Sequence, residues 1–349
     1  MNFASDNVYG VHPKILASLS EANAATSPSY GGDSFTARAE ERLKEVFGCD
    51  LRAFLVTTGT AANGLSLSAI TPGYGAIICN AEAHISVDEC NSPEMFTGGA
   101  KIMGLQGTGG KITPAQVEKT LKGFIRGEHD PKPKGVSLTN ATELGTVYSP
   151  AEVTAFSRLI RPRGMKLHMD GARFANAVAG LGVTPAELTW KAGVDVLSFG
   201  ATKNGAMMLE AVIFFDLSLA EDFAYRRMRS GQLISKSRYL GAQMLAYLEG
   251  GLWLENARRA NALAQKLAAG LTRTGTVRIP NPVEANEVFA VMPRSLYDRL
   301  LASGAMFYDW MPDSLGGAIG DHEIFTRFVL SFATPEDEVE RFVQLVAAG

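Results

Sequence analysis

The chain has 349 residues, of which 46% are hydrophobic and 20% are charged, a balance typical of a globular protein with a large domain and a smaller one. A formal net charge of −3, without runs of like charge, argues against a nucleic-acid partner, and no apolar run approaches the ~18 residues that a membrane span needs. Three distant cysteines predict reduced thiols and no metal site, and with an amino-terminal segment unlike a signal peptide they favour a cytoplasmic protein.

From about residue 50, short apolar runs alternate with helical patterns, which predicts an α/β fold with a mostly parallel, seven-stranded sheet covered by helices. The expected strands are residues 52–57, 75–80, 101–105, 135–140, 166–170, 194–199 and 210–216. Three helices between them have a clear start signal, in which Thr or Ser precedes a proline and Gln or Glu follows at the third helical position. These capping boxes are Thr113 with Gln116, Ser149 with Glu152 and Thr184 with Glu187.

The pattern changes after about residue 250. A helix rich in alanine and leucine, at 253–271, leads to short apolar runs and two further helices, of which the last is expected to open at Thr334 and Pro335. We therefore predict a large domain over residues 1–250 and a small carboxyl-terminal α+β domain over residues 251–349.

Ligands of a parallel sheet bind beyond the carboxyl ends of its strands, so the residues at these ends are candidate site residues. After the first expected strand, Thr58, Gly59 and Thr60 offer hydroxyls and free N–H groups at a helix start, which suits a phosphate but is also typical of an ordinary turn. Asp170 ends the fifth strand, where it suits a metal ion, a helix cap or a buried cation. His168, on the same strand, is expected to be a hydrogen-bonded core histidine.

Lys203 follows the sixth strand in the stretch DVLSFGATKNGAM, among small uncharged residues where a surface lysine is unusual. A lysine amine can form an imine with an aldehyde. A phosphate cradle, an aspartate and a lysine at successive strand ends are the three partners that pyridoxal 5'-phosphate needs for its phosphate, its pyridine nitrogen and its aldehyde. His84, just past the second strand, suits stacking on the cofactor ring, with a core histidine as the ordinary alternative.

Six motifs along the chain resemble those of the low-specificity L-threonine aldolases, closest to the bacterial phenylserine and threonine aldolase branch. They are FASDN (3–7), YGGD (30–33), TTGTAAN (57–63), AHISVDEC (83–90), HMDGARFANA (168–177) and ELTWKAGVDVLSFGATKNG (187–205). The resemblance implies the aspartate-aminotransferase-like fold (fold type I of pyridoxal phosphate enzymes) and a homotetramer of two catalytic dimers. It also implies that L-threonine, L-allo-threonine and other β-hydroxy-α-amino acids, such as β-phenylserine, are cleaved to glycine and an aldehyde.

The resemblance assigns cofactor roles position by position. Lys203 would bind the cofactor covalently, Asp170 would pair with its pyridine nitrogen, and His84 would stack on its ring. The remaining cofactor contacts would come from Thr58, Gly59, Thr60, Asn140 and Arg173.

The resemblance also assigns substrate roles. Ser5, Arg173 and Arg327 would hold the substrate carboxylate, a task that suits a bidentate guanidinium, and Tyr30 would be contributed across a subunit boundary. His129 matches a family histidine beside the substrate hydroxyl and is the first candidate for the general base, with His84 second. Lys236 and Arg238 fall where the family brings a basic group toward the phosphate of a neighbouring subunit.

Two stretches depart from the family pattern. Many threonine aldolases have ENTH after the fourth strand, where this chain has TNATE (139–143), with Thr142 in place of the histidine. A stretch that is glycine-rich in the family here reads SGQLISKSR (230–238). The cofactor set is intact, but substrate preference and neighbour contacts stay open.

Three other functions stay open from the sequence. A different pyridoxal phosphate reaction, β-elimination or transamination, would use the same cofactor set. A nucleotide-binding protein is more distant, because GTGGK (107–111) lacks the Ser or Thr of a phosphate loop and precedes a capped helix. A cofactor-binding regulator without catalysis would lack the carboxylate clamp or carry a DNA-binding extension, and the sequence shows neither.

Overall fold

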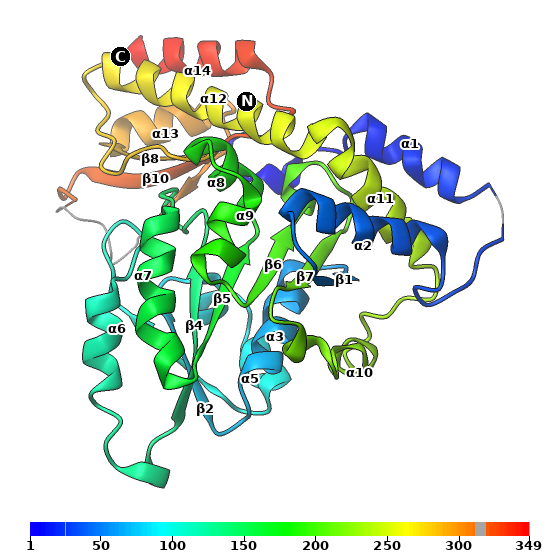
Figure 1. The fold of residues 1–349 in the computed structure, drawn as a ribbon. Coiled ribbons are helices and arrows are strands. Elements are labelled where there is room, and N and C mark those ends of the chain that lie inside the picture. The colour runs from blue at the N-terminus through cyan, green and yellow to red at the C-terminus, as the bar shows by residue number, and fades with distance from the viewer. Residues whose placement is uncertain (25, 311–318, 349) are drawn as a thin grey trace.

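The computed structural model describes residues 1–24, 26–310 and 319–348. A seven-stranded sheet with the order β1-β7-β6-β5-β4-β2-β3 forms the centre of the larger part (Figure 1). Its strands are β1 (Arg52–Val56), β2 (Gly75–Asn80), β3 (Lys101–Leu105), β4 (Lys132–Thr139), β5 (Lys166–Gly171), β6 (Val196–Gly200) and β7 (Glu210–Phe214). Only β7 runs against the others, because it pairs antiparallel with both β1 and β6. The predicted mostly parallel, seven-stranded sheet is confirmed.

Helices cover both faces of the sheet (Figure 1). In the larger part they are α1 (Pro13–Ala22), α2 (Ser34–Phe47), α3 (Gly59–Ile70), α4 (His84–Val87), α5 (Ser92–Thr97), α6 (Pro114–Leu121), α7 (Pro150–Ile160), α8 (Phe174–Leu181), α9 (Pro185–Leu188), α10 (Phe223–Arg229) and α11 (Arg238–Leu248). Successive side chains of a buried strand point to opposite faces. In β6, Leu197 and Phe199 therefore pack into one core with α2, α7 and α8, whereas Val196 packs into a second core with α3 and α10.

All three capping boxes predicted from the sequence are present, at the starts of α6, α7 and α9. The start of the last helix, α14 (Glu336–Ala347), differs from the expectation. The hydroxyl of Thr334 accepts a hydrogen bond from the N–H of Ser331 at 2.9 Å instead of capping the helix, and Pro335 takes the cap position without a side-chain bond.

The smaller part contains a three-stranded antiparallel sheet of the order β8-β10-β9. Its elements are β8 (Glu287–Pro293), β9 (Tyr308–Asp309), β10 (Glu323–Val329), α12 (Leu252–Arg273), α13 (Arg294–Ala302) and α14. Helix α12 serves both parts, because Trp253 and Ala257 pack into the core of the larger part and Leu263 and Leu267 into that of the smaller part. The division after residue 250 stays a prediction.

The first residues of the chain join the smaller part. Phe3 packs into its core, its N–H donates to the carbonyl of Met306 at 2.8 Å, and its carbonyl accepts from the N–H of Val329 at 2.9 Å. Three residues further on, η1 (Asp6–Val8) begins and lies against the larger part, in contact with the 3₁₀ turn η5 (Thr202–Asn204). The amino-terminal segment thus links the two parts of the molecule.

Two further observations bear on the sequence interpretation. The GTGGK stretch forms a turn closed by a bridge between Thr108 and Lys111, with Gly109 and Gly110 at positive φ, so it is not a phosphate loop. Among the residues that the structure describes, no helix is both long enough and apolar enough to cross a membrane.

Candidate active site

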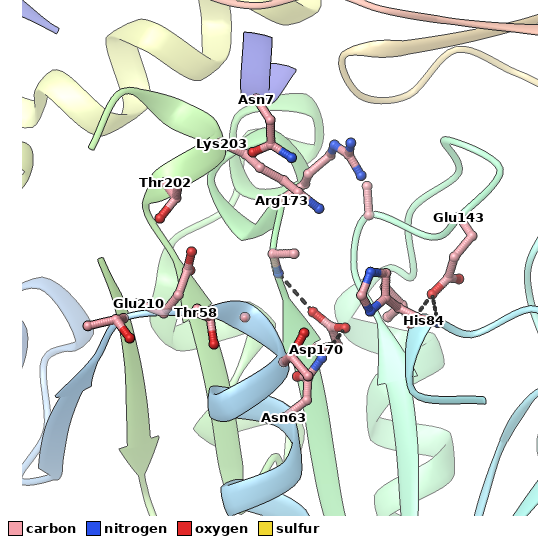
Figure 2. Close-up of a pocket in the computed structure, with 16 residues that line it drawn as sticks. Asn7, Thr58, Asn63, His84, Glu143, Asp170, Arg173, Thr202, Lys203 and Glu210 are labelled. Atoms are coloured by element: carbon pink, nitrogen blue, oxygen red, sulfur yellow. Dashed lines mark hydrogen bonds between the residues drawn. The ribbon is translucent and has the colours of Figure 1, made fainter. Parts of the chain in front are cut away.

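A pocket of about 290 Å³ opens at the carboxyl ends of the parallel strands (Figure 2). Residues from the ends of β1, β2, β4, β5 and β6 line it, as expected for a parallel sheet. From the predicted set, the pocket brings together Thr58, Gly59, Thr60, His84, Asp170, Arg173 and Lys203. Four lining residues that the sequence analysis missed are Asn7, Asn63, Glu143 and Glu210.

One end of the pocket is formed by the amino terminus of α3. Thr58 caps this helix, because its Oγ1 accepts from the N–H of Ala61 at 3.1 Å, and its hydroxyl hydrogen remains available to a ligand. The first N–H groups of a helix have no partner within the helix, so those of Gly59 and Thr60 are donors on the pocket side. A Cβ atom added to Gly59 would meet no atom within 4 Å, which shows open space beside this terminus. The arrangement suits a phosphate group.

Asp170 lies in β5 near its carboxyl end, with only 3% of its surface exposed. Its Oδ1 accepts from the N–H of Ala172 at 2.9 Å, and its Oδ2 accepts from the Nδ2 of Asn63, on α3, at 2.8 Å. Two donors therefore orient the carboxylate at the pocket wall. The group is suited to holding a proton on a ring nitrogen.

His84 begins α4, and its imidazole lines the pocket opposite α3 (Figure 2). Its Nδ1 lies 2.7 Å from Oε1 of Glu89, and its Nε2 lies 3.5 Å from Oδ2 of Asp88. The hydrogen bond to Glu89 raises the pKa of His84, aided by the charge of Asp170 and opposed by burial and by Lys203. Since a carboxylate only accepts, the Nδ1 of His84 carries the shared hydrogen.

Lys203 lies in η5, directly after β6, and its side chain points into the pocket (Figure 2). The approach of β6 to β5 explains why a glycine precedes this turn, because a Cβ atom on Gly200 would lie 2.4 Å from the carbonyl oxygen of Ala172. The glycine therefore brings the Lys203 turn close to the end of β5, where Asp170 lies.

The pocket fits pyridoxal phosphate in the chemistry of its donors. A lysine amine, an anchored carboxylate, helix N–H groups with threonine hydroxyls and an imidazole all line one space. These are the groups that the aldehyde, the pyridine nitrogen, the phosphate and the ring face of this cofactor require. Lys203, Asp170, Thr58 and His84 would hold it.

Arg173 is already bound by an acid of its own chain. Its Nε and Nη2 donate to the carboxylate of Asp6 at 2.8 and 3.1 Å, and its Nη1 lies 3.5 Å from Oε2 of Glu287. Although burial alone would raise the pKa of Asp6, the charges of Arg173 and Lys203 outweigh it, and the pKa is lowered. The Nε and Nη2 edge of Arg173 is thus used within the protein, and a substrate carboxylate would share its Nη1 with Glu287.

Ser5 and Arg327 lie behind this arginine and are not among the lining residues of the pocket. Ser5 caps η1 by accepting from the N–H of Asn7 at 3.1 Å. Arg327, from β10, stacks on Trp310 with 4.3 Å between its guanidinium carbon and the ring centre. Its Nε is buried and has no hydrogen-bond partner among the described residues, which leaves a donor for a ligand.

Asn140 is not among the lining residues of the pocket and its amide bonds to Tyr148, so its role at the cofactor stays a prediction. Its Nδ2 donates to the carbonyl of Tyr148 and its Oδ1 accepts from the N–H of the same residue, both at 3.0 Å. Thr142 also points away from the pocket, since its hydroxyl contacts that of Thr146 at 2.8 Å. In an extended segment alternate residues share a side, and here Thr139 and Glu143 line the pocket.

Glu143 is the unforeseen carboxyl group of this segment. Its Oε1 accepts from the backbone N–H of His84 at 3.0 Å and from the hydroxyl of Thr139 at 2.7 Å. Burial raises the pKa of Glu143 to about 7. The group anchors the start of α4 and thereby the backbone of His84.

The structure does not bring His129 to this pocket. It is exposed in η2 (Gly127–His129), before the amino end of β4, whereas the pocket lies at the carboxyl end. Eight residues of strand span roughly 25 Å. The expectation that His129 lies beside the substrate hydroxyl is therefore not met within one chain, and the imidazole in place is that of His84.

Tyr30, Lys236 and Arg238 also lie outside the pocket-lining set. Tyr30 is 54% exposed, at a positive φ of 56°, and its N–H donates to the carbonyl of Ser235 at 3.0 Å. This contact places Tyr30 beside the segment that carries Lys236 and Arg238. Their cross-subunit roles stay predictions.

The sheet topology and the lysine, aspartate and helix terminus around one pocket define the aspartate-aminotransferase-like, fold type I class of pyridoxal phosphate enzymes. A serine palmitoyltransferase of Sphingomonas wittichii has the same fold, with a TM-score of 0.73 at 16% identity over 100% of this chain and 86% of that one. A threonine aldolase of Leishmania major matches more closely, with a TM-score of 0.92 at 29% identity over 99% of this chain and 98% of that one.

Sequence comparison identifies the family within this class of enzymes. The family model described as beta-eliminating lyase matches residues 2–295. A low-specificity L-threonine aldolase of a Pseudomonas species is 44% identical over 347 residues, which cover 99% of this chain and 97% of the relative. The chain belongs to the beta-eliminating lyase family and, within it, to the low-specificity L-threonine aldolases.

Proposed function

We propose that this protein cleaves L-threonine, L-allo-threonine and other β-hydroxy-α-amino acids, such as β-phenylserine, to glycine and an aldehyde. The observation that carries the proposal is that Lys203, Asp170 and His84 line one pocket, in a chain 44% identical to an L-threonine aldolase. The bound cofactor supplies the electron sink that accepts the bonding pair when the Cα–Cβ bond breaks.

The residues of the pocket would bind the cofactor and orient the substrate. Lys203 would hold the cofactor through Nζ, Asp170 would keep a proton on its pyridine nitrogen, and the terminus of α3 would bind its phosphate. The Nη1 side of Arg173 and the guanidinium of Arg327 hold the substrate carboxylate. A fixed carboxylate determines which bond at Cα is presented for cleavage, and such orientation contributes much of the rate.

His84 takes the proton of the β-hydroxyl group at its Nε2. The O–H electron pair becomes the carbonyl bond of the aldehyde as the Cα–Cβ bond breaks, and Cα later takes up one proton, so the turnover releases no net proton. Glu89, bound to Nδ1 at 2.7 Å, stabilises the imidazolium that forms. This support resembles in kind what an aspartate provides to a catalytic histidine in hydrolases.

A direct assay tests this function. We expect the purified protein to show a visible cofactor band, and to release acetaldehyde and glycine in equal amounts from L-threonine. Lys203→Ala should abolish both the band and turnover, because no other amine occupies that place in the pocket. A Lys203→Ala protein with wild-type turnover would overturn the assignment.

β-Elimination is the second candidate, because the family model carries that description. The same pocket can support it or transamination, since the cofactor and its partners are shared. The products decide: ammonia and a keto acid from threonine would favour β-elimination, and a keto acid without free ammonia would favour transamination. Acetaldehyde with glycine would exclude both as the main reaction.

We also propose that the protein forms a homotetramer of two catalytic dimers and that it is located in the cytoplasm. Two features support assembly: Tyr30 is exposed, and the Nε atoms of Arg227 and Arg238 are buried without a hydrogen-bond partner among the described residues. A cytoplasmic place agrees with Cys49, Cys79 and Cys90, which are all unpaired thiols. Cell fractionation tests the location.

A further inference from the structure

Four side chains form a continuous hydrogen-bonded row along the wall of the pocket. The Nδ1 of His84 lies 2.7 Å from Oε1 of Glu89. The Nδ2 of Asn63 donates to that same Oε1 at 2.8 Å and also to Oδ2 of Asp170 at 2.8 Å. One amide group of α3 therefore joins the histidine proposed as the base, through Glu89, to the carboxylate proposed for the pyridine nitrogen. Figure 2 shows Asn63 beside Asp170.

The direction of this amide is set by its surroundings. Asn63 is 3% exposed, and its Oδ1 is buried without a hydrogen-bond partner among the described residues. The opposite orientation would place Oδ1 against two carboxylate oxygens, none of which has a hydrogen to donate. Both hydrogens of Nδ2 are thus committed to Glu89 and Asp170, although this leaves an unsatisfied carbonyl oxygen inside the protein.

A buried oxygen without a hydrogen bond costs free energy, so the two N–H groups of Asn63 are expected to have a compensating effect on the carboxyl groups that they contact. Glu89 is only 6% exposed, and burial raises its pKa. Burial and the neighbouring charge of Asp170 both favour a neutral Glu89, whereas a hydrogen bond from an amide favours the charged form. Without Asn63, Glu89 would lose this support for its charged form. A neutral Glu89 would no longer stabilise an imidazolium on His84.

We propose that Asn63 is a positioning residue that keeps Glu89 ionised while it orients Asp170, and so links the proton-accepting capacity of His84 to the carboxylate that faces the cofactor's ring nitrogen. The inference deepens the proposed function and rests on it. Asn63 touches neither the substrate hydroxyl nor Lys203 in this role, because it acts through the two carboxylates.

The charged groups around His84 fix how the inference is tested. Besides Glu89, they are Asp88 at 3.5 Å from Nε2, Asp170, Lys203, and Glu143, whose Oε1 accepts from the backbone N–H of His84. A valid test removes the amide and leaves these five groups in place. Asn63→Ala does so, and Asn63→Leu keeps the side-chain volume without a donor or an added charge.

The first measurement uses the cofactor-free protein. The chain has five histidines, so their ring signals can be followed by NMR across pH, and His84→Asn identifies the signal of His84. We expect Asn63→Ala to lower the pKa of His84 by about one unit or more, as Glu89→Gln does, because both remove the charged acceptor. The double variant should show no further fall, since both changes act on one contact.

A matched control is available on α8. Asn176 is a buried amide whose Nδ2 donates to Oδ1 of Asn261 at 3.0 Å, outside the pocket. Asn176→Ala should leave the pKa of His84 unchanged. Additive effects of Asn63→Ala and Glu89→Gln, or an unchanged pKa of His84 in Asn63→Ala, would overturn the inference. If Asn63→Ala does not fold, the near-isosteric Asn63→Leu, which also lacks the donor and adds no charge, gives the same readout.

The second measurement uses the holoenzyme. Because His84 must be neutral to accept the hydroxyl proton, kcat/KM for threonine falls below its pKa, and in Asn63→Ala this acid limb should move to lower pH by the shift that NMR records. Exchange of the α-hydrogen of glycine with solvent needs no β-hydroxyl, so its pH profile should keep its acid limb. Equal displacement of both profiles would contradict the role at His84.

The two measurements separate the inference from the proposed function. If wild-type protein releases no aldehyde from any β-hydroxy-α-amino acid, the proposed function fails. The NMR comparison of Asn63→Ala with Glu89→Gln still decides whether the amide keeps Glu89 ionised.

Discussion

Glu210 shows how one buried carboxyl group changes the response of the protein to pH. It begins β7, is 7% exposed and accepts from the N–H of Ala201 at 3.1 Å, and burial raises its pKa to about 7 from an ordinary 4.5. Below the lower value the group is neutral in both the folded and the unfolded state and has no effect. Above the higher value the buried charge reduces the free energy of unfolding by about 3 kcal/mol.

Glu210→Gln should therefore raise the free energy of unfolding of the cofactor-free protein by about 2–3 kcal/mol near pH 9, and leave it unchanged near pH 4. Urea denaturation at several pH values measures this. Glu187 is the matched control, because it is exposed and the N–H of Thr184 lowers its pKa. Glu187→Gln should lower stability at high pH, so a gain in both variants would contradict the argument.

Single residues also show how far the sequence could be interpreted. Asp170 and Lys203 were predictable because each directly follows an apolar strand, and the ends of parallel strands meet at one edge of the sheet. Asn63 and Glu89 were not, because their roles arise from contacts between a helix and a loop that no local pattern specifies. Asn140 shows a related limit: whether its amide faced the pocket or Tyr148 depended on the path of the chain after β4.

At the scale of elements, the close contact between the ends of β6 and β5 determines where the turn with Lys203 lies. Gly200→Ala would put a Cβ atom 2.4 Å from the carbonyl oxygen of Ala172. We expect this substitution to lower the free energy of unfolding by about 1–3 kcal/mol and to weaken cofactor binding, because the overpacked strand shifts the turn that carries Lys203. Denaturation and the visible cofactor band measure the two effects.

Gly10 supplies the control for this contact. A Cβ atom there would meet no atom within 4 Å, so Gly10→Ala should change stability by less than about 0.5 kcal/mol and leave the cofactor band intact. A Gly200→Ala protein as stable as Gly10→Ala, with full cofactor binding, would show that the approach of the strands is not what positions Lys203.

Some features of the elements followed from the sequence more readily than others. The capping boxes were predictable, since each is a local pattern of four residues. The sequence prediction did not specify that β7 is antiparallel, although the length of the segment between β6 and β7 indicates it. Residues 201–209 are too few for the crossover of about a dozen or more residues that joins two parallel strands.

At the scale of the whole molecule, the arginines beside Tyr30 carry the prediction of assembly. We expect the wild-type protein to sediment as a tetramer of the 37.3 kDa chain. Arg238→Ala should raise the dissociation constant of the assembly by about tenfold or more, because Arg238 lies in the segment beside the exposed Tyr30, where we expect another copy to bind. Analytical ultracentrifugation over a range of concentrations measures both.

Arg278 offers the comparison for this test. Its Nη2 already binds Glu323 of its own chain at 3.0 Å, so Arg278→Ala should leave the assembly unchanged. A wild-type monomer, or equal weakening by both variants, would contradict the prediction. The oligomeric state could not be derived from the sequence patterns, because exposure of Tyr30 and isolation of a guanidinium appear only once the chain has folded.

The continuity of α12 has a mechanical consequence for how a ligand enters. Its 22 residues form a rod of roughly 33 Å that is embedded at one end in each apolar core. The amino-terminal segment fastens the two parts a second time, through Phe3 on one side and Asp6 on the other. A wide hinge motion between the two parts would have to bend α12 and break the contacts of the amino-terminal segment. We therefore expect a ligand to enter the pocket through movements of side chains, such as Arg327, while the two parts keep their relative positions.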